Sequence, residues 1–445
     1  MLKIVLISTY ELGRQPFGLA SPAAWLRADG HQVTCVDLAC GPLPGLAVAE
    51  ADLLAFYLPM HTATRLAIAA IEKVRMLNPG AHLCCYGLYA PMNEPYLGEL
   101  GVRTILGGEF EQGLRDLAGR LPDGASGPKR EPLISLARQQ FLTPDRSGLP
   151  ALGRYARLLI GGERKLVGYT EASRGCSHLC RHCPIVPVYN GTFRVVNRGV
   201  VLEDIRRQVE AGAEHITFGD PDFFNGPGHA IAIVEALHAE HPSVTYDTTI
   251  KIEHLLQYRD LLPVLKKTGC LFVTSAVESI DDVVLVKLAK GHTRADFIQA
   301  VGIMRDTQLT LAPTFVTFTP WTTWEGYREL LHVIADLEMV ENVGPIQLAM
   351  RLLIPAGSLL LELAEIREMI GLFDPAALSY KWQHSDRELD QLCAEIQKLI
   401  QHEERRKASR SEIFSKIWEL AHGQPHDFHL ASPATIPYLN EPWYC

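Results

Sequence analysis

The sequence lacks the features that would place the protein in a membrane or outside the cell. None of its apolar runs approaches the roughly 18 residues that span a bilayer. The apolar stretch in the first 8 residues is too short for a signal peptide, and no small-residue cleavage site follows it. No solenoid-type repeat is visible either. We therefore expect a cytoplasmic protein with no membrane partner.

Positive charge is not in excess. The 445 residues include 42 Lys and Arg against 51 Asp and Glu, a net charge of −9. This balance argues against binding nucleic acid through bulk charge. Hydrophobic residues make up 47% and charged residues 21% of the chain, which excludes a disordered, collagen-like or coiled-coil protein. At roughly 100–200 residues per domain, the length predicts more than one domain.

Residues 1–118 alternate short apolar runs with amphipathic stretches. Strands are predicted at residues 3–8, 33–37, 53–57, 82–86 and 103–106, and helices at 22–29, 64–77 and 110–121. Strands that alternate with helices in this way indicate a parallel sheet covered on both faces, here a Rossmann-like α/β domain. Such sheets bind ligands beyond the carboxyl ends of their strands.

The rest of the chain divides into three parts. Residues 119–165 are rich in proline and glycine, so we expect a linker there. Residues 166–356 alternate again, with strands expected at 167–172, 215–219, 244–249, 270–277, 310–318 and 346–351. Such a count indicates a partial (βα)6 barrel, whose active site would lie at the strand C-termini. Residues 357–445 are expected to form a mostly helical C-terminal region with an irregular tail.

The most informative motif is a cluster of cysteines. Cys176, Cys180 and Cys183 follow the first predicted barrel strand with C-x3-C-x2-C spacing. Thiolates are the natural ligands of iron–sulfur clusters and of zinc. Three of them reach three corners of a cubane cluster, whereas a structural zinc ion needs a fourth ligand, which His178 or His182 would supply. Both interpretations are open at this point.

This segment resembles the radical S-adenosylmethionine (radical SAM) superfamily. The flanking Ser173-Arg174-Gly175 and Pro184 are similar to those of the superfamily, although His182 stands where an aromatic residue is common. The resemblance implies a catalytic 4Fe–4S cluster on the three cysteines, with a fourth iron that binds S-adenosylmethionine (SAM). One electron from the cluster would cleave SAM to a 5′-deoxyadenosyl radical.

The same resemblance implies which residues contact SAM. They follow the second and fourth predicted barrel strands and are Gly219, Asp220, Asp222, Ser275 and Glu278. A carboxylate there would pair with the SAM ammonium group, but a turn or a helix cap is an equally good interpretation of either aspartate. The nearby Lys290-Gly291-His292 is expected to be a solvated turn.

A parallel α/β domain ahead of such a barrel resembles the cobalamin-binding class of radical SAM proteins. The resemblance implies cobalamin contacts in the loops that end the strands, at Ser8, Tyr10, Gly18, Gly87, Gly107, Gly108 and Glu109. Glycines there let the backbone approach a bulky corrin closely. We interpret His31 as a surface turn residue, so cobalt is expected to have no histidine ligand from the protein. A degenerate α/β domain that binds nothing, or a flavodoxin-like domain, is the alternative.

The end of the chain carries a further resemblance. The stretches 351–358 and 436–445 are similar to a subfamily of cobalamin-type radical SAM proteins whose tails carry Cys-Cys or Cys-selenocysteine followed by Ala-Glu-Pro. Because the sequence stops at Cys445, the first residue of that motif, we expect a selenocysteine codon read as a stop. The nucleotides after codon 445 would test this expectation.

Together these resemblances imply a cobalamin-dependent radical SAM enzyme. It would take one electron from a flavodoxin- or ferredoxin-type donor and remove hydrogen from an unreactive carbon, with methylation of that carbon as the expected outcome. The sequence does not indicate the substrate. Two alternatives are a radical SAM enzyme without methyl transfer or without cobalamin, and a non-catalytic zinc- or iron–sulfur-binding regulator.

Overall fold

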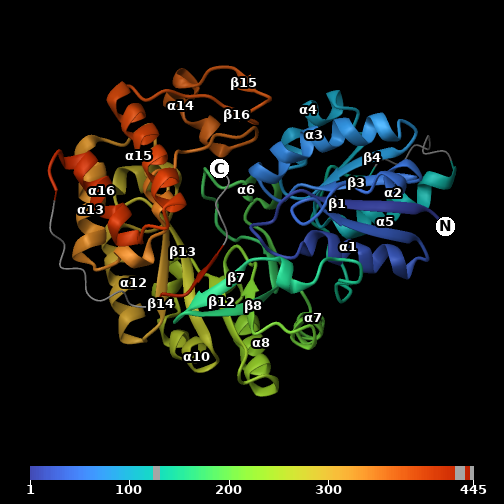
Figure 1. Cartoon of the computed structure of the whole chain (residues 1–445), viewed down its shortest axis with the longest axis horizontal. Helices are drawn as coiled ribbons and strands as arrows, with labels where there is room; N and C mark the ends of the chain where they lie inside the picture. Colours follow the sequence, from blue (N-terminus) through green and yellow to red (C-terminus); the bar gives the residue numbers. More distant parts are fainter. Residues whose placement is uncertain (124–130, 426–435, 441–445) are drawn as a thin grey trace.

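Two mainly parallel sheets organise the chain, whose computed structural model describes residues 1–123, 131–425 and 436–440. Figure 1 shows the two sheets side by side, each with helices around it, and the short helix α6 (Val186–Tyr189) between them. No helix within these ranges is both long enough and apolar enough to cross a membrane. The expected tail motif at Cys445 lies outside the described residues.

The N-terminal sheet has the strand order β2-β1-β3-β4-β5-β6 and is parallel throughout. Its strands are β1 (Lys3–Ser8), β2 (Gln32–Asp37), β3 (Leu53–Tyr57), β4 (His82–Tyr86), β5 (Thr104–Gly108) and β6 (Ile134–Ser135). Its helices are α1 (Phe17–Ala28), α2 (Gly45–Ala49), α3 (His61–Leu77), α4 (Glu94–Glu99) and α5 (Phe110–Arg120). The Rossmann-like fold predicted for this part is confirmed.

Both faces of this sheet are covered, which explains why its strands read as continuous apolar runs. Helices α1 and α5 pack on one face, and α2, α3 and α4 pack on the other. Cys84 and Cys85 belong to opposite faces, as the alternation of side chains along a strand requires. From β1 the next strand along the chain, β2, lies on one side, and β3 to β6 follow on the other side. Such folds bind ligands at this switch point, in a crevice beyond the carboxyl ends of the strands.

The second sheet has the order β14-β13-β12-β11-β8-β7-β17. Its parallel strands are β8 (Glu163–Thr170), β11 (His215–Phe218), β12 (Thr245–Thr249), β13 (Cys270–Glu278) and β14 (Thr310–Phe315), while β7 (Arg157–Ile160) and β17 (Tyr438–Leu439) add an antiparallel edge. The helices around it are α7 (Arg198–Glu210), α8 (Pro227–Glu240), α9 (Ile252–Gln257), α10 (Leu262–Lys267), α11 (Asp282–Leu288), α12 (Arg294–Asp306) and α13 (Trp324–Asp336). This is an open half-barrel, as predicted.

Two details differ from the sequence prediction. The sixth barrel strand expected at 346–351 is instead a 3-10 helix (Pro345–Leu348) followed by a single bridge between Phe318 and Arg351. The reason is that the side chain of Gln347 accepts the hydrogen bond of the Phe315 amide, at 3.0 Å, in place of a strand carbonyl. The stretch 119–165, expected to be a linker, contributes β6 to one sheet and β7 to the other.

The C-terminal region covers one end of the second sheet and is mostly helical, as expected. It consists of α14 (Ala364–Met369), the small hairpin β15 (Phe373–Asp374) and β16 (Ser379–Tyr380), α15 (Arg387–Arg405) and α16 (Arg410–His422). Helices α15 and α16 pack their apolar faces into the same core as the half-barrel. In Figure 1 the hairpin lies above the junction of the two sheets.

Candidate cofactor site between the two sheets

The cysteine loop begins where the short strand β9 (Ser173–Gly175) ends. This strand pairs with β10 (Phe193–Val195), so the loop between them folds back on itself. Gly175 has a φ of +75°, and a Cβ there would lie 2.4 Å from the carbonyl oxygen of Thr192. Only glycine fits this turn. A second turn brings the amide of Cys183 to the carbonyl of Cys180 at 3.1 Å.

The three loop thiols lie near enough to influence one another electrostatically. Cys176 and Cys180 are buried and Cys183 is half-buried. Burial, followed by the charges of Cys180 and Cys176, raises the pKa of the Cys183 thiol to about 12. Neighbouring thiols become stable thiolates when one cationic centre takes their charge. A set of three soft sulfur donors therefore fits an iron–sulfur cluster.

The turn after β11 is hydrogen-bonded to the residues that lead into this loop. Asp220 accepts hydrogen bonds from the Ala172 amide at 2.9 Å and from the Ser173 hydroxyl at 2.6 Å. Burial is the main reason that the pKa of Asp220 is raised to about 7. At Gly219 a Cβ would lie 1.8 Å from the hydroxyl of Tyr169, so no side chain fits there. Both predicted SAM contacts thus hold β8, β9 and β11 together.

Asp222 has two roles in the structure. One carboxylate oxygen accepts from the Phe224 amide at 3.2 Å, which confirms the cap interpretation for this residue. The other oxygen, Oδ2, lies 2.7 Å from His254 Nδ1 and 3.5 Å from His178 Nε2. Sequence reasoning missed His254, whose only signal is its position shortly after β12, a strand that ends at the same edge of the sheet.

Ser275 and Glu278, the predicted contacts on β13, have different surroundings. Ser275 is fully buried, and its hydroxyl has no hydrogen-bond partner in the described part of the chain. Glu278 Oε1 lies 3.1 Å from His182 Nε2 and 3.6 Å from Lys290 Nζ. Burial alone would raise the pKa of Glu278, but Lys290 and His182 lower it to about 2. Ser275 is therefore available to a ligand, whereas Glu278 is ionised and paired.

The segment Lys290-Gly291-His292 is not the solvated turn that the sequence suggested. Lys290 is 3% exposed and His292 is 5% exposed. The charge of Lys290 is compensated by Glu278, and a ring nitrogen of His292 lies 3.2 Å from the Val277 carbonyl. Because the compensating carboxylate comes from another element, the sequence alone could not show that this turn is buried.

Arg174 connects the cysteine loop to the N-terminal sheet. Its guanidinium lies 2.7 Å from Glu111, 2.7 Å from Glu171 and 3.4 Å from Glu109. The Tyr189 hydroxyl donates to Glu109 at 3.1 Å. Glu109, which the resemblance assigned to cobalamin, is therefore engaged within the protein. Sequence reasoning missed Glu111, because an acidic residue in the first turn of a helix is also explained by the helix dipole.

Two of the predicted cobalamin glycines are packed against the protein itself. A Cβ at Gly18 would lie 2.2 Å from the ring of Tyr57, and one at Gly107 would lie 2.2 Å from the ring of Pro91. These two positions therefore need glycine for internal packing. The close approach predicted from the sequence is present, but the approaching group is a side chain of this chain.

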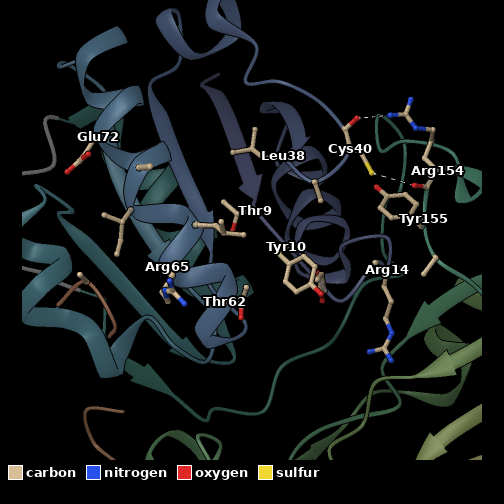
Figure 2. Close-up of a pocket in the computed structure, with 18 of the residues that line it drawn as sticks. Thr9, Tyr10, Arg14, Leu38, Cys40, Thr62, Arg65, Glu72, Arg154 and Tyr155 are labelled. Carbon is tan, nitrogen blue, oxygen red and sulfur yellow. Dashed lines mark hydrogen bonds between the residues drawn. The ribbon is translucent and has the colours of Figure 1, made fainter. Parts of the chain in front are cut away.

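A cavity of about 850 Å³ lies beyond the carboxyl ends of β1 and β2. Figure 2 shows Thr62 and Arg65 of α3 on one side, Cys40 and Tyr155 on the other, and the predicted cobalamin contact Tyr10 between them. Buried polar atoms without a hydrogen-bond partner among the described residues lie at the end of β1 and in the loop after it: Ser8 Oγ, Glu11 Oε2 and Arg14 Nε. Glu11 and Arg14 line the cavity. A roomy crevice with unsatisfied polar groups fits a large ligand with polar substituents.

A smaller cavity, of about 340 Å³, lies between the two sheets. Gly87 and Gly108 line it from the N-terminal sheet, and Ser173, Gly219 and Asp220 line it from the half-barrel. Glu11 and Arg14 line both cavities, so the two spaces adjoin. The structure thus brings predicted residues from both parts of the chain to one space beside the cysteine loop.

Comparison with known proteins agrees with this geometry. Residues 170–333 match the Radical SAM superfamily. This match covers the half-barrel and agrees with the resemblance carried by the cysteine loop. Its sequence is 26% identical over 345 residues to a hopanoid C-3 methylase of Methylococcus capsulatus, which covers 74% of this chain and 65% of that relative. The chain therefore spans slightly less than two thirds of the length of this curated relative.

Solved structures extend the likeness to both parts of the chain. The radical SAM methyltransferase TsrM from Kitasatospora setae, solved with tryptophan and a SAM analogue, gives a TM-score of 0.63 at 16% identity, over 85% of this chain and 82% of that chain. The cobalamin-dependent SAM radical enzyme OxsB, solved with aqua-cobalamin and SAM, gives 0.67 at 14% identity, over 87% and 66%. At these identities the likeness shows a shared fold.

Proposed function

We propose that the chain is a cobalamin-dependent radical SAM enzyme that holds a 4Fe–4S cluster on Cys176, Cys180 and Cys183. The observation that carries the proposal is that the three thiols lie near one another at the carboxyl edge of the half-barrel, where Cys176 and Cys180 are buried and Cys183 is half-buried. The match of residues 170–333 to the superfamily supports it. The proposed radical SAM barrel extends over 166–356 and the C-terminal region over 357–445, and the connecting segment 119–165 contributes a strand to each sheet.

When bound, the cofactors supply a reducing electron that cleaves SAM to a 5′-deoxyadenosyl radical, and a methyl group carried on cobalt. The residues of the chain bind, orient and shield. Ser275 offers its unpaired buried hydroxyl to SAM, while Gly219 and Asp220 line the space beside the loop. Asp222 and Glu278 are charged groups at the same edge, and each is held by its own partners.

We propose that cobalamin binds to the N-terminal part, residues 1–118. The cavity of about 850 Å³ and the unsatisfied polar atoms of the β1 loop support this assignment. Tyr10 would contact it there, and Gly87 and Gly108 would face it from the smaller cavity. Ser8 lines neither cavity but precedes the lining residue Thr9, and its contact with cobalamin stays a prediction. OxsB was solved with aqua-cobalamin bound and shares the fold. No residue of the loop after β1 is assigned as a ligand of cobalt.

The proposed reaction is methylation of an unactivated carbon. It rests on the similarity to a protein named hopanoid C-3 methylase and on the fold shared with the methyltransferase TsrM. A flavodoxin- or ferredoxin-type protein would supply the electron, and the enzyme would work in the cytoplasm. The substrate is not assigned.

The test of the cluster is anaerobic reconstitution of the full-length protein with iron and sulfide. We expect about four iron atoms per chain and formation of 5′-deoxyadenosine when SAM and a reductant are added. Replacing any one of the three loop cysteines by Ala should abolish both. Cys393→Ala, at a buried thiol of the helical core, serves as the control and should keep both. A loop variant that still binds the cluster and cleaves SAM would overturn the proposal.

The test of cobalamin uses a variant that fills the larger cavity. Ala69 lines that cavity, whereas Met76 on the same helix is 78% exposed and does not. We expect Ala69→Trp to lose cobalamin measured by its visible absorption, and Met76→Trp to keep it, with iron content unchanged in both. Cobalamin retained equally in both variants would mean that it binds outside this cavity, and none in the wild-type protein would leave a radical SAM enzyme without cobalamin.

A further inference from the structure

A buried carboxyl group in the loop after β1 lies at the junction of the two cavities. Glu11 is 7% exposed and lines both of them. Its Oε2 has no hydrogen-bond partner in the part of the chain that the structure describes, and neither does Nε of Arg14, which also lines both cavities. Because buried polar groups in native proteins are nearly always hydrogen-bonded, an unsatisfied carboxyl at this junction is expected to meet a polar group of a ligand.

We propose that Glu11 holds cobalamin by hydrogen bonding to a primary amide group at the edge of the corrin ring. The inference rests on the proposed function, because it takes cobalamin to occupy the larger cavity. The resemblance to known families assigned no role to Glu11, so only its position in the structure indicates one. A turn in which the Arg14 amide donates to the Glu11 carbonyl at 2.9 Å fixes the backbone that carries it.

The surroundings of Glu11 determine which ligand group it binds. Burial, followed by the charge of Glu171, raises the pKa of Glu11 well above its usual range, and the nearby Arg14 offsets only part of this effect. The side chain is therefore a neutral carboxylic acid, which offers one O–H donor and one carbonyl acceptor. A primary amide offers the matching carbonyl acceptor and N–H donor side by side. The two groups therefore pair through two hydrogen bonds.

Other ligand groups fit this position less well. A cationic group would need an ionised carboxylate, and the burial of Glu11 opposes that ionisation. A phosphate would use the O–H donor of Glu11 and leave its carbonyl oxygen unsatisfied. Cobalamin carries primary amide side chains around its corrin ring, so one of them satisfies both oxygen atoms of the carboxyl group.

The test is titration of the full-length protein, purified without cofactor, with methylcobalamin in the dark, followed by the quenching of tryptophan fluorescence. Glu11→Leu removes both hydrogen bonds and should lower the affinity by about 10- to 100-fold. Glu11→Gln keeps a donor and an acceptor and should stay within about fivefold of wild type. Equal affinities of Glu11→Leu and wild type would overturn the proposal.

Glu72→Leu is the matched control. Glu72 lines the same larger cavity from α3, but its side chain is exposed. Water already satisfies an exposed carboxylate, so this variant should change the affinity by less than about fivefold. A loss as large as that of Glu11→Leu would show that any negative charge removed from the cavity has this effect, and the specific role of Glu11 would be wrong.

The stability of the cofactor-free protein separates a binding role from a structural one. A buried carboxyl without a partner costs stability, so Glu11→Leu should raise the urea concentration at the midpoint of unfolding. Weaker binding together with a higher midpoint is the result we expect. If Glu11→Leu lowers the midpoint and Glu11→Gln restores it without any change in affinity between the three proteins, Glu11 supports the fold and the proposal is wrong.

The ligand side of the contact is tested with methylcobalamin derivatives in which one amide at a time is converted to a methyl ester, which has no N–H. For one derivative the affinity of wild type should fall by about 3- to 10-fold, while Glu11→Leu should bind it as well as it binds methylcobalamin. If no derivative behaves in this way, the contact is not to an amide. Wild-type protein that binds no methylcobalamin would remove the cobalamin assignment as well, whereas failure of the ester series alone removes only the role of Glu11.

Discussion

The guanidinium of Arg174 meets the carboxylate of Glu111 through two contacts, 2.7 Å between Nη2 and Oε1 and 2.9 Å between Nη1 and Oε2. Arg174 lies two residues before the first loop cysteine, and Glu111 lies in the first turn of α5, on the N-terminal sheet. Both side chains are buried. This pair therefore fixes the cysteine loop relative to the N-terminal part of the chain, where the second cofactor is proposed to bind.

We predict that Arg174→Met destabilises the protein by about 3–5 kcal/mol, because it leaves Glu111, Glu109 and Glu171 buried without their cation. Arg115→Met is the matched control. Arg115 pairs with Asp29 at 2.6 Å, but its side chain is 45% exposed, so its loss should cost less than about 1 kcal/mol. Urea unfolding measures both, and equal costs would contradict the role given to Arg174.

The carboxyl group of Glu109 predicts a dependence of stability on pH. Burial is the main cause that raises its pKa from 4.5 to about 7. In this range the folded chain holds a proton that the unfolded chain has lost. The resulting stability is complete below pH 4.5, declines as the pH rises, and is lost above about 7. Glu109→Gln has no such proton to lose.

We therefore expect Glu109→Gln to gain stability relative to wild type as the pH rises from about 5 to about 8, by up to about 3 kcal/mol. Urea unfolding at several pH values measures the difference between the two proteins. Tyr189 can still donate its hydrogen bond to the amide oxygen of the variant, so the comparison isolates the charge. If the free energy of unfolding changes with pH in the same way for both proteins, the prediction is wrong.

Local patterns explain why much of the fold followed from the sequence. Strands such as Lys3–Ser8 and His82–Tyr86 are short apolar runs between amphipathic helices, and this alternation specifies a covered parallel sheet without any long-range information. The cysteine loop is likewise a local motif, since its spacing and its glycine lie within one segment of chain. The resemblance to the superfamily, the 4Fe–4S cluster and SAM could be inferred from it for that reason, whereas cobalamin was inferred from the α/β domain ahead of it.

What the sequence could not show depends on partners far away along the chain. Lys290 looks like a solvated lysine until Glu278 of β13 is seen beside it. The side chain of Gln347 replaces a strand hydrogen bond of Phe315, so an apolar run that reads as a strand becomes a 3-10 helix. Periodicity describes a segment and its exposed or buried face, but it does not identify such specific pairings.

The buried charge of Lys290 gives a third prediction. Lys290→Met should destabilise the protein by about 3–5 kcal/mol, because Glu278 remains buried with only His182 as its partner. Lys287→Met removes an ion pair with Glu365 in which both side chains are more than one third exposed, with 36% and 37% of their area accessible. That control should cost less than about 1 kcal/mol. Thermal and urea unfolding of the two variants would distinguish a buried from a solvated Lys290.

Gly219, at the end of β11, gives the last prediction. A methyl group there would lie 1.8 Å from the hydroxyl oxygen of Tyr169 and 2.1 Å from the carbon that carries it. The ring has little freedom to move, because Arg14 lies over it at 5.1 Å and Phe17 meets it edge-on at 6.2 Å. We expect Gly219→Ala to cost about 1–3 kcal/mol of stability, as overpacking of a buried contact does.

Gly228 is the matched control for Gly219. It lies in the first turn of α8, and a Cβ there would meet no described atom within 4 Å. Gly228→Ala should therefore leave stability unchanged or raise it by up to about 1 kcal/mol. A double-mutant cycle with Tyr169→Ala locates the cause, because removing the ring should cancel most of the cost of Gly219→Ala and give a coupling energy above about 0.5 kcal/mol. If the two effects simply add, the glycine is needed there for a reason other than the closeness of Tyr169.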